Sequence, residues 1–203
     1  MWKSPQDYPY HQWSRRELEN ATYREIAEAA NVALGTVAGV MKALTKQGFL
    51  VEFPKEQRKL KRKKELLGMW TIAYAEKLRQ KILIGRYTAN TPTFWERLDL
   101  HPFGAQWGGE VAANKMTHYL KPELITVYTR KPINELILTQ KLRKDETGPV
   151  ELRERFWKFE TDENILVPPL LVYADLLATA ETRNIESARV IYDEFLDRPL
   201  REN

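Results

Sequence analysis

Residues 22–53 hold the pattern that most constrains how this chain can fold. Thr22 is followed three positions later by Glu25, a spacing at which each side chain accepts a hydrogen bond from the other residue's backbone N–H at the start of a helix. The pattern predicts a helix over residues 23–30, with isoleucine and alanine on one apolar face. Residues 31–35 follow as a turn.

A second helix is predicted from about Leu34 to Gln47. Apolar residues recur there at i, i+3, i+4 and i+7, the spacing of a buried stripe: Val37, Val40, Met41 and Leu44. Gly48 suits a left-handed helix cap, and residues 49–53 have the β-branched and aromatic composition of a short strand. Two helices, a short turn and a following strand predict a winged helix-turn-helix.

The outer face of this second helix suits DNA. It carries small residues, a hydroxyl and two lysines: Gly35, Thr36, Gly39, Lys42 and Lys46. Small residues let a helix backbone approach DNA closely, while hydroxyls and lysines bind base edges and phosphates. Tyr23 and Arg24, at the start of the first helix, are further candidate DNA contacts. The alternative is a winged helix used only for protein contacts.

Positive charge is concentrated beside this pattern. Residues 1–64 contain 13 lysine and arginine residues against 7 acidic ones, whereas residues 65–203 contain 19 against 21. Seven cations lie in ten consecutive residues: Lys55, Arg58, Lys59, Lys61, Arg62, Lys63 and Lys64. Such a run neutralises phosphates, so we expect double-stranded DNA as the partner and an affinity that falls steeply with salt. The alternative is a solvated linker helix whose lysines only increase solubility.

Composition excludes several other classes of protein. The chain has no cysteine, which excludes disulfides, thiolate metal sites and cysteine nucleophiles. It has no apolar run of about 18 residues, so no membrane span is expected. The N-terminal residues lack the apolar core of a secretion signal, and we expect a cytoplasmic protein.

The remainder of the chain reads as a second domain. Strands are predicted at residues 82–87, 124–129 and 150–159, with helices at 60–83, 108–119, 133–142 and 170–179 and a last helix capped by Asn184. The expected fold class is α+β, with a winged helix-turn-helix and its basic extension in residues 1–64. Residues 65–203 are expected to form a mixed α/β domain of three or four strands packed by helices.

No enzyme site is expected. Residues 107–113, followed by a helix and a strand, have the order of a nucleotidyltransferase core, where a Gly-Gly turn cradles phosphates and carboxylates on the next strand bind metal. That strand offers Thr126 and Tyr128 instead, which cannot hold a divalent cation as carboxylates do. The two glycines are then expected to form a tight turn into the helix. The three histidines lack ligand spacing, so we predict no catalytic residues, metal ligands or cofactor.

Asp175 is an acid inside an otherwise apolar helix. A lone buried carboxylate is costly, and Arg183 or Asn184 after the next turn is within reach. We expect a structural ion pair that holds the last two helices together, with a functional site as the alternative. For Arg86 and Glu110 the sequence leaves the same two possibilities open, a structural role and a ligand-binding role.

Five blocks in order carry a resemblance to a known family: residues 22–27, 34–37, 83–87, 107–110, and 170–178 with the pair 183–184. They resemble the AbiEi-type antitoxins, winged-helix transcriptional regulators of abortive-infection, type IV toxin–antitoxin systems. The resemblance implies an N-terminal winged helix that represses its own operon. It also implies a C-terminal domain that counteracts a nucleotidyltransferase toxin without stable toxin contact. Members are often longer at the N-terminus, so we expect a short member or part of a larger protein.

The main hypothesis is therefore a sequence-specific DNA-binding regulator of the antitoxin type, with inverted repeats expected as its operator. One alternative is an interaction module whose C-terminal domain binds another protein or a toxin's substrate, with vestigial DNA binding. Another is a catalytically inactive transferase-like domain that still binds a nucleotide.

Overall fold

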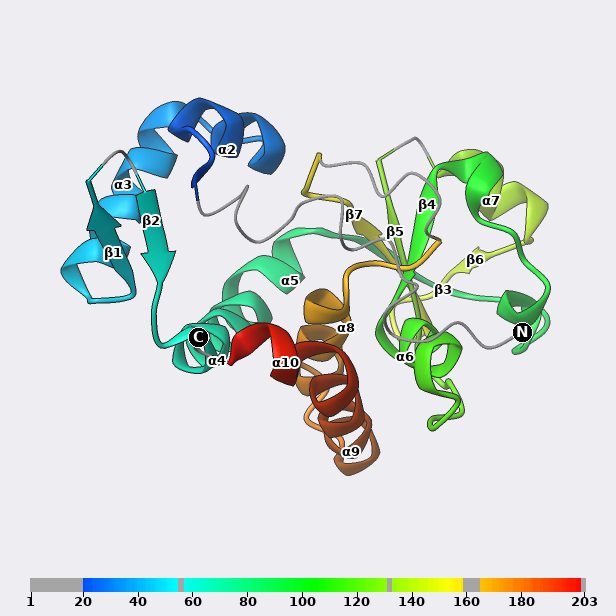
Figure 1. Cartoon of the computed structure of the whole chain (residues 1–203). Helices are drawn as coiled ribbons and strands as arrows, with labels where there is room; N and C mark the ends of the chain where they lie inside the picture. Colours follow the sequence, from blue (N-terminus) through cyan, green and yellow to red (C-terminus); the bar gives the residue numbers. More distant parts are fainter. Residues whose placement is uncertain (1–19, 55–56, 131–132, 159–164, 202–203) are drawn as a thin grey trace. The chain divides into compact units, whose positions relative to one another are not determined.

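A computed structural model describes residues 20–201 except 55–56, 131–132 and 159–164 (Figure 1). The chain divides into two compact units. Unit 1 consists of the described parts of residues 1–70, 156–162 and 199–203, and unit 2 of those of 71–155 and 163–198. The division falls between Trp70 and Thr71, and the domain boundary expected near residue 65 stays a prediction.

The first helix of unit 1, α2 (Tyr23–Ala30), begins as the sequence predicts. The Thr22 backbone N–H donates to the Glu25 carboxylate over 2.6 Å, and the Glu25 N–H donates to the Thr22 hydroxyl over 3.2 Å. The Thr22 N–H and the Thr22 hydroxyl both donate to the Glu25 carboxylate and lower the pKa of Glu25, because they favour its charged form. The helix ends at Asn31, whose φ of 56° is left-handed.

The second helix, α3 (Leu34–Lys46), also has the predicted position, and Gly48 after it is left-handed with φ 74°. The predicted buried stripe is correct at Val37, which is buried, and partly at Met41 and Leu44, which are half-buried. It is wrong at Val40, whose surface is 51% exposed. Val40 lies about 60° around the helix from Val37, outside the narrow stripe that packs on α2.

A β-hairpin follows α3. The predicted strand forms β1 (Leu50–Phe53), and β2 (Gln57–Leu60) pairs with it antiparallel, with Leu50 opposite Leu60. The sequence pattern did not predict β2, because its lysine and arginine residues favour helix on their own. Pairing with β1 imposes the extended conformation instead. The basic run therefore spans β2 and the first turn of α4 (Lys63–Ala73).

Unit 2 is built on one mixed sheet of five strands, in the order β4-β5-β7-β3-β6. Its strands are β3 (Leu83–Thr88), β4 (Ala105–Gly108), β5 (Ile125–Thr129), β6 (Arg143–Lys144) and β7 (Val150–Glu154). β5 and β7 run parallel, and the other neighbours run antiparallel. The expectation of three or four strands is wrong, because β6 has only two residues and β4 contains none of the β-branched residues that mark a strand in the sequence.

The free side of β4 is covered by a separate segment of the chain. The Trp107 N–H donates to the Ile165 carbonyl, and the Val167 N–H donates to the Trp107 carbonyl over 2.9 Å. At the opposite edge, β6 has only two residues, both charged and exposed. Short charged edges and covered edges both limit further strand pairing.

Two helices, α6 and α8, pack on one part of this sheet, and a third, α9, packs on those two helices (Figure 1). α6 (Gly109–Thr117) contacts β4 and β5, and α8 (Pro169–Leu177) contacts α6 and β4. The remaining helical segments of unit 2 are a π-helical turn η1 (Tyr74–Leu78), the short helices α5 (Arg79–Lys81), η2 (Phe94–Glu96), η3 (His101–Phe103) and α7 (Asn134–Thr139), then α9 (Thr182–Ile191), the π-helical turn η4 (Tyr192–Leu196) and α10 (Asp197–Leu200).

One helix prediction needs correction. α9 begins at Thr182 with Glu181 as its cap, so Asn184 is not a helix cap but a fully buried residue of the first turn. α8 buries Val172 and Leu176 and exposes Leu170. In the part of the chain that the structure describes, no helix has the length and apolar character to cross a membrane.

Replacing Gly148 by alanine should destabilise unit 2. An added Cβ would lie 2.3 Å from the Tyr87 carbonyl oxygen in β3, and this backbone atom cannot move without disturbing the sheet. We expect Gly148→Ala to reduce the free energy of unfolding by about 1–3 kcal/mol, measured by urea denaturation. Gly68→Ala is the control, since nothing lies within 4 Å of its added Cβ, and it should be neutral or slightly stabilising. Equal stability of the two variants would contradict the prediction.

Candidate functional site

The residues predicted to contact DNA on α3 all lie on its surface. Gly35, Thr36, Gly39, Lys42 and Lys46 are exposed. At 100° per residue, the two glycines and the two lysines form one line along the helix, opposite the stripe that contains Val37. The structure therefore leaves the predicted face of α3 open to a ligand.

Two cations of the basic run instead hold unit 1 together. The Arg58 guanidinium donates to the Ala21 carbonyl, and its carbon lies 5.3 Å from the centre of the Tyr23 ring. The Arg62 guanidinium pairs with Glu65 and donates to the Gln47 carbonyl over 3.0 Å. It also stacks on the ring of Phe49, the residue before β1. Removal of either arginine would change folding as well as any binding.

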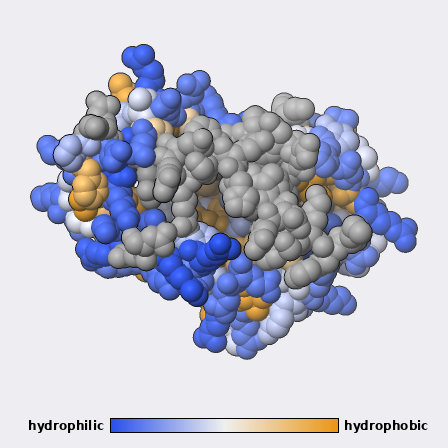
Figure 2. Space-filling model, viewed as in Figure 1, coloured by the Kyte–Doolittle hydropathy of each residue, from blue (hydrophilic) through white to orange (hydrophobic). Residues whose placement is uncertain are grey.

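The other predicted cations are distributed around this hairpin. Lys59 lies in β2, Lys61 follows it, and Lys63 and Lys64 open α4. Arg24 is exposed on α2, and Lys55 lies outside the described residues. Figure 2 also shows apolar surface among hydrophilic residues on the β1 side of unit 1, at the left of the view. The large apolar residues exposed on α3 and β1 are Leu34, Val40, Val51 and Phe53.

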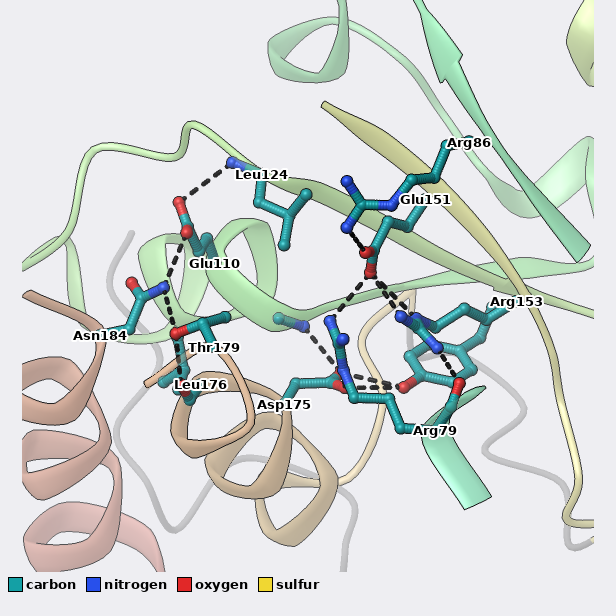
Figure 3. Close-up of polar contacts among 12 residues, drawn as sticks. Arg79, Arg86, Glu110, Leu124, Glu151, Arg153, Asp175, Leu176, Thr179 and Asn184 are labelled. Atoms are coloured by element: carbon teal, nitrogen blue, oxygen red, sulfur yellow. Dashed lines mark hydrogen bonds and ion pairs between the residues drawn. The ribbon is translucent and has the colours of Figure 1, made fainter. Parts of the chain in front are cut away.

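A buried polar cluster connects the sheet of unit 2 to its helical cover (Figure 3). At its centre, the Glu151 carboxylate on β7 accepts hydrogen bonds from three guanidinium groups. Arg79 donates over 2.9 Å, Arg153 donates through Nη2 over 2.7 Å and through Nε over 3.1 Å, and Arg86 donates from β3. Burial would raise the pKa of Glu151, but Arg79 and Arg153 outweigh it and lower that pKa.

Asp175 on α8 lies next to this cluster and is also buried. It accepts hydrogen bonds from the Tyr74 hydroxyl over 2.6 Å, the Tyr128 hydroxyl over 2.9 Å and the Gly109 N–H over 3.2 Å. Its Oδ1 lies 3.6 Å from Arg79 Nε. Burial raises the pKa of Asp175, while burial and the nearby carboxyl group raise the pKa of both tyrosines.

The predicted partners of Asp175 are wrong, because Arg183 and Asn184 bind Glu110 instead. Asn184 Nδ2 donates to Glu110 over 2.9 Å, and Arg183 forms an ion pair with it. The same carboxylate accepts from the Glu123 N–H over 2.7 Å. Glu110 therefore joins α6, α9 and the start of β5. The structural ion pair that the sequence predicted for Asp175 is made by Glu110 and Arg183 instead.

The Gly108-Gly109 turn into α6 is filled by the protein itself. A Cβ on Gly108 would lie 2.5 Å from the Tyr128 ring, and Gly109 has a left-handed φ of 49°. The Gly109 N–H, which would face a phosphate in a nucleotide-binding turn, donates to Asp175. Among the described residues there is also no group of three or more acidic or histidine side chains placed to hold a metal ion. The glycines therefore serve close packing.

The sequence patterns point to only part of this cluster. They indicate Arg86 and Asp175, but not Arg79, Glu151 or Arg153. The available signal was on the third strand of the sequence, where Glu151 and Arg153 lie two positions apart and so point to one face of a strand flanked by apolar residues. A charged pair on the face of a buried strand indicates an internal ion pair.

Glu151→Gln should remove the charge that balances three guanidinium groups. We expect the free energy of unfolding to fall by about 3–5 kcal/mol at neutral pH, measured by urea denaturation. The lowered pKa of Glu151 means that its stabilising effect is present above its unfolded pKa and is lost as the pH falls through the folded pKa. The difference between wild type and variant should therefore shrink below about pH 4.

The matched control is Glu186→Gln, which neutralises an exposed acid on α9. It should leave both the stability at neutral pH and its pH dependence almost unchanged. A Glu151→Gln variant that resembled this control would show that the cluster contributes little.

Comparison with known proteins places the chain in a family. A family profile described as "Transcriptional regulator, AbiEi antitoxin, Type IV TA system" matches residues 59–197, from β2 to the start of α10. No curated protein and no solved structure matches the chain. The match confirms the resemblance seen in the sequence and covers more than half of the 203 residues. The chain therefore belongs to the AbiEi antitoxin family of transcriptional regulators of type IV toxin–antitoxin systems.

Proposed function

We propose that unit 1 is a winged helix-turn-helix that binds operator DNA and represses the operon of this antitoxin. α3 enters the major groove, and the β1–β2 hairpin acts as the wing beside it. The observation that carries the proposal is the open face of α3, with Lys42 and Lys46, in a chain whose family consists of transcriptional regulators. The matched span begins at Lys59, so α2 and α3 add an argument that is independent of the family.

Phosphate contacts in this proposal come from a set of cations around the hairpin and the helices. They are Arg24, Lys42, Lys46, Lys55, Lys59, Lys61, Lys63 and Lys64, with Tyr23 as a further polar contact. Arg58 and Arg62 support the fold of the site, because their guanidinium groups bind backbone carbonyls. Binding through many phosphates releases counterions, so affinity should depend strongly on salt.

Unit 2 is proposed to counteract a nucleotidyltransferase toxin without itself transferring phosphoryl or nucleotidyl groups. The filled Gly108-Gly109 turn supports this, because the Gly109 N–H, which would bind a phosphate, already donates a hydrogen bond to Asp175. Tyr128 likewise lies on the strand that carries the metal-binding carboxylates in an active nucleotidyltransferase, and its hydroxyl donates a hydrogen bond to Asp175. We expect a gene for a nucleotidyltransferase toxin next to the gene for this chain. Coexpression of this chain should relieve the toxicity of that enzyme.

The DNA-binding proposal is tested by a gel shift with the DNA upstream of this chain's own gene. Lys42→Ala and Lys46→Ala should each weaken binding and reduce the slope of log affinity against log salt by about 1. Lys81→Ala is the matched control, an exposed lysine on α5 in unit 2, and should bind as wild type does. Unchanged affinity and slope in both α3 variants would overturn the proposal.

A further inference from the structure

We propose that α3 recognises its operator through the methyl groups of thymine, not through the forked hydrogen bonds that read guanine or adenine. This inference rests on the proposed DNA-binding function and concerns the chemistry of the same surface. It follows from the side chains that α3 exposes and from the charge around them.

The exposed part of α3 is nearly without hydrogen-bonding side chains. Among the side chains that make paired hydrogen bonds to base edges, the helix has only lysine, at Lys42 and Lys46, and no arginine, asparagine, glutamine or acidic residue. In helix-turn-helix proteins the N-terminal residues of the recognition helix contact base edges, and both lysines lie in the second half of α3. Its two hydroxyl groups belong to Thr36 and Thr45, and the Thr45 hydroxyl donates to the Met41 carbonyl over 3.0 Å. Two lysines complete the polar groups of the helix, both in its second half.

Apolar and small groups make up the rest of the accessible helix. Val40 is half exposed, and Ala38 and Ala43 are exposed. On the wheel of the helix, Ala43 and the methyl group of Thr36 lie next to the line that runs through Gly39, and Val40 lies farther round on the same side. Ala38 lies on the other side of that line. Valine, alanine and threonine methyl groups contact the C5-methyl group of thymine, which is the apolar group that base pairs present in the major groove.

The glycines in this line have no role in the packing of unit 1. Nothing lies within 4 Å of a Cβ built on Gly35 or Gly39, and both are in the helix, where glycine is unfavourable relative to alanine. Bare backbone at these two positions lets the neighbouring methyl groups reach a partner surface. Gly35 and Gly39 therefore make α3 less stable than alanine would, at two positions that face outward.

Charge identifies that partner as a polyanion. Lys42 and Lys46 continue the line of the glycines, and the basic run lies in the adjoining hairpin. A polyanion that also presents apolar methyl groups at the scale of one helix is the major groove of thymine-containing DNA.

The experiment uses the full chain and its own upstream DNA, with the bound segment first mapped by footprinting. In the test duplex, every thymine of that segment is replaced by deoxyuridine, which removes the methyl group and keeps base pairing. We expect affinity to fall about fourfold for each contacted methyl group. The control duplex carries as many deoxyuridines outside the footprint and should bind as the natural DNA does.

A protein variant gives an independent measurement. Gly39→Ala should raise the melting temperature, because alanine favours helix, yet weaken binding to natural DNA at least severalfold. Gly68→Ala in α4 is the control for the added methyl group and should leave DNA binding unchanged.

The outcomes separate the two proposals. Equal binding of natural and deoxyuridine DNA, or full affinity of Gly39→Ala, would overturn thymine recognition and leave the DNA-binding function standing. Absence of binding to any upstream DNA would overturn the DNA-binding function itself, and the thymine inference with it.

Discussion

The Glu151 carboxylate and its three arginines form the interaction on which unit 2 depends. Arg153 comes from the same strand, Arg86 from β3 and Arg79 from the helical segment before it, so one carboxylate fixes elements separated by more than 60 residues in sequence. Charges in a protein interior must be balanced, because each isolated ion loses its hydration. The cluster therefore ties these elements to one another, because removal of the carboxylate would leave buried guanidinium groups without their counter-charge.

The same polar interior shapes what unit 2 can do. Asp175 accepts hydrogen bonds from the Gly109 N–H and the Tyr128 hydroxyl, so these two groups beside the Gly-Gly turn are already bonded within the protein. Unit 1 has the opposite character, with α3 burying only a narrow stripe and leaving cationic and apolar groups exposed. An interior whose charged groups pair with one another suits a scaffold, while an open helix face suits recognition of another macromolecule.

Local patterns in the sequence predicted unit 1 well. The Thr22–Glu25 capping and the left-handed Gly48 involve contacts within a few residues, and the structure has both. The apolar periodicity of α3 predicts its buried stripe except at Val40. Predictions failed where a distant partner decides the outcome. β2 is extended because β1 pairs with it, and the partner of Asp175 was misassigned because proximity in sequence pointed to Arg183, which binds Glu110 from across the fold.

The sequence by itself determined the α2–α3 pair, the position of the cationic run, the main strands of the sheet and the family of the chain. These features depend on local propensity, periodicity and residue identity. Tertiary structure alone decided the order of the five strands, the partners of the buried acids and which cations support the fold. The physical reason is that burial and charge pairing act between segments far apart in the chain, and their geometry is set only when those segments pack together.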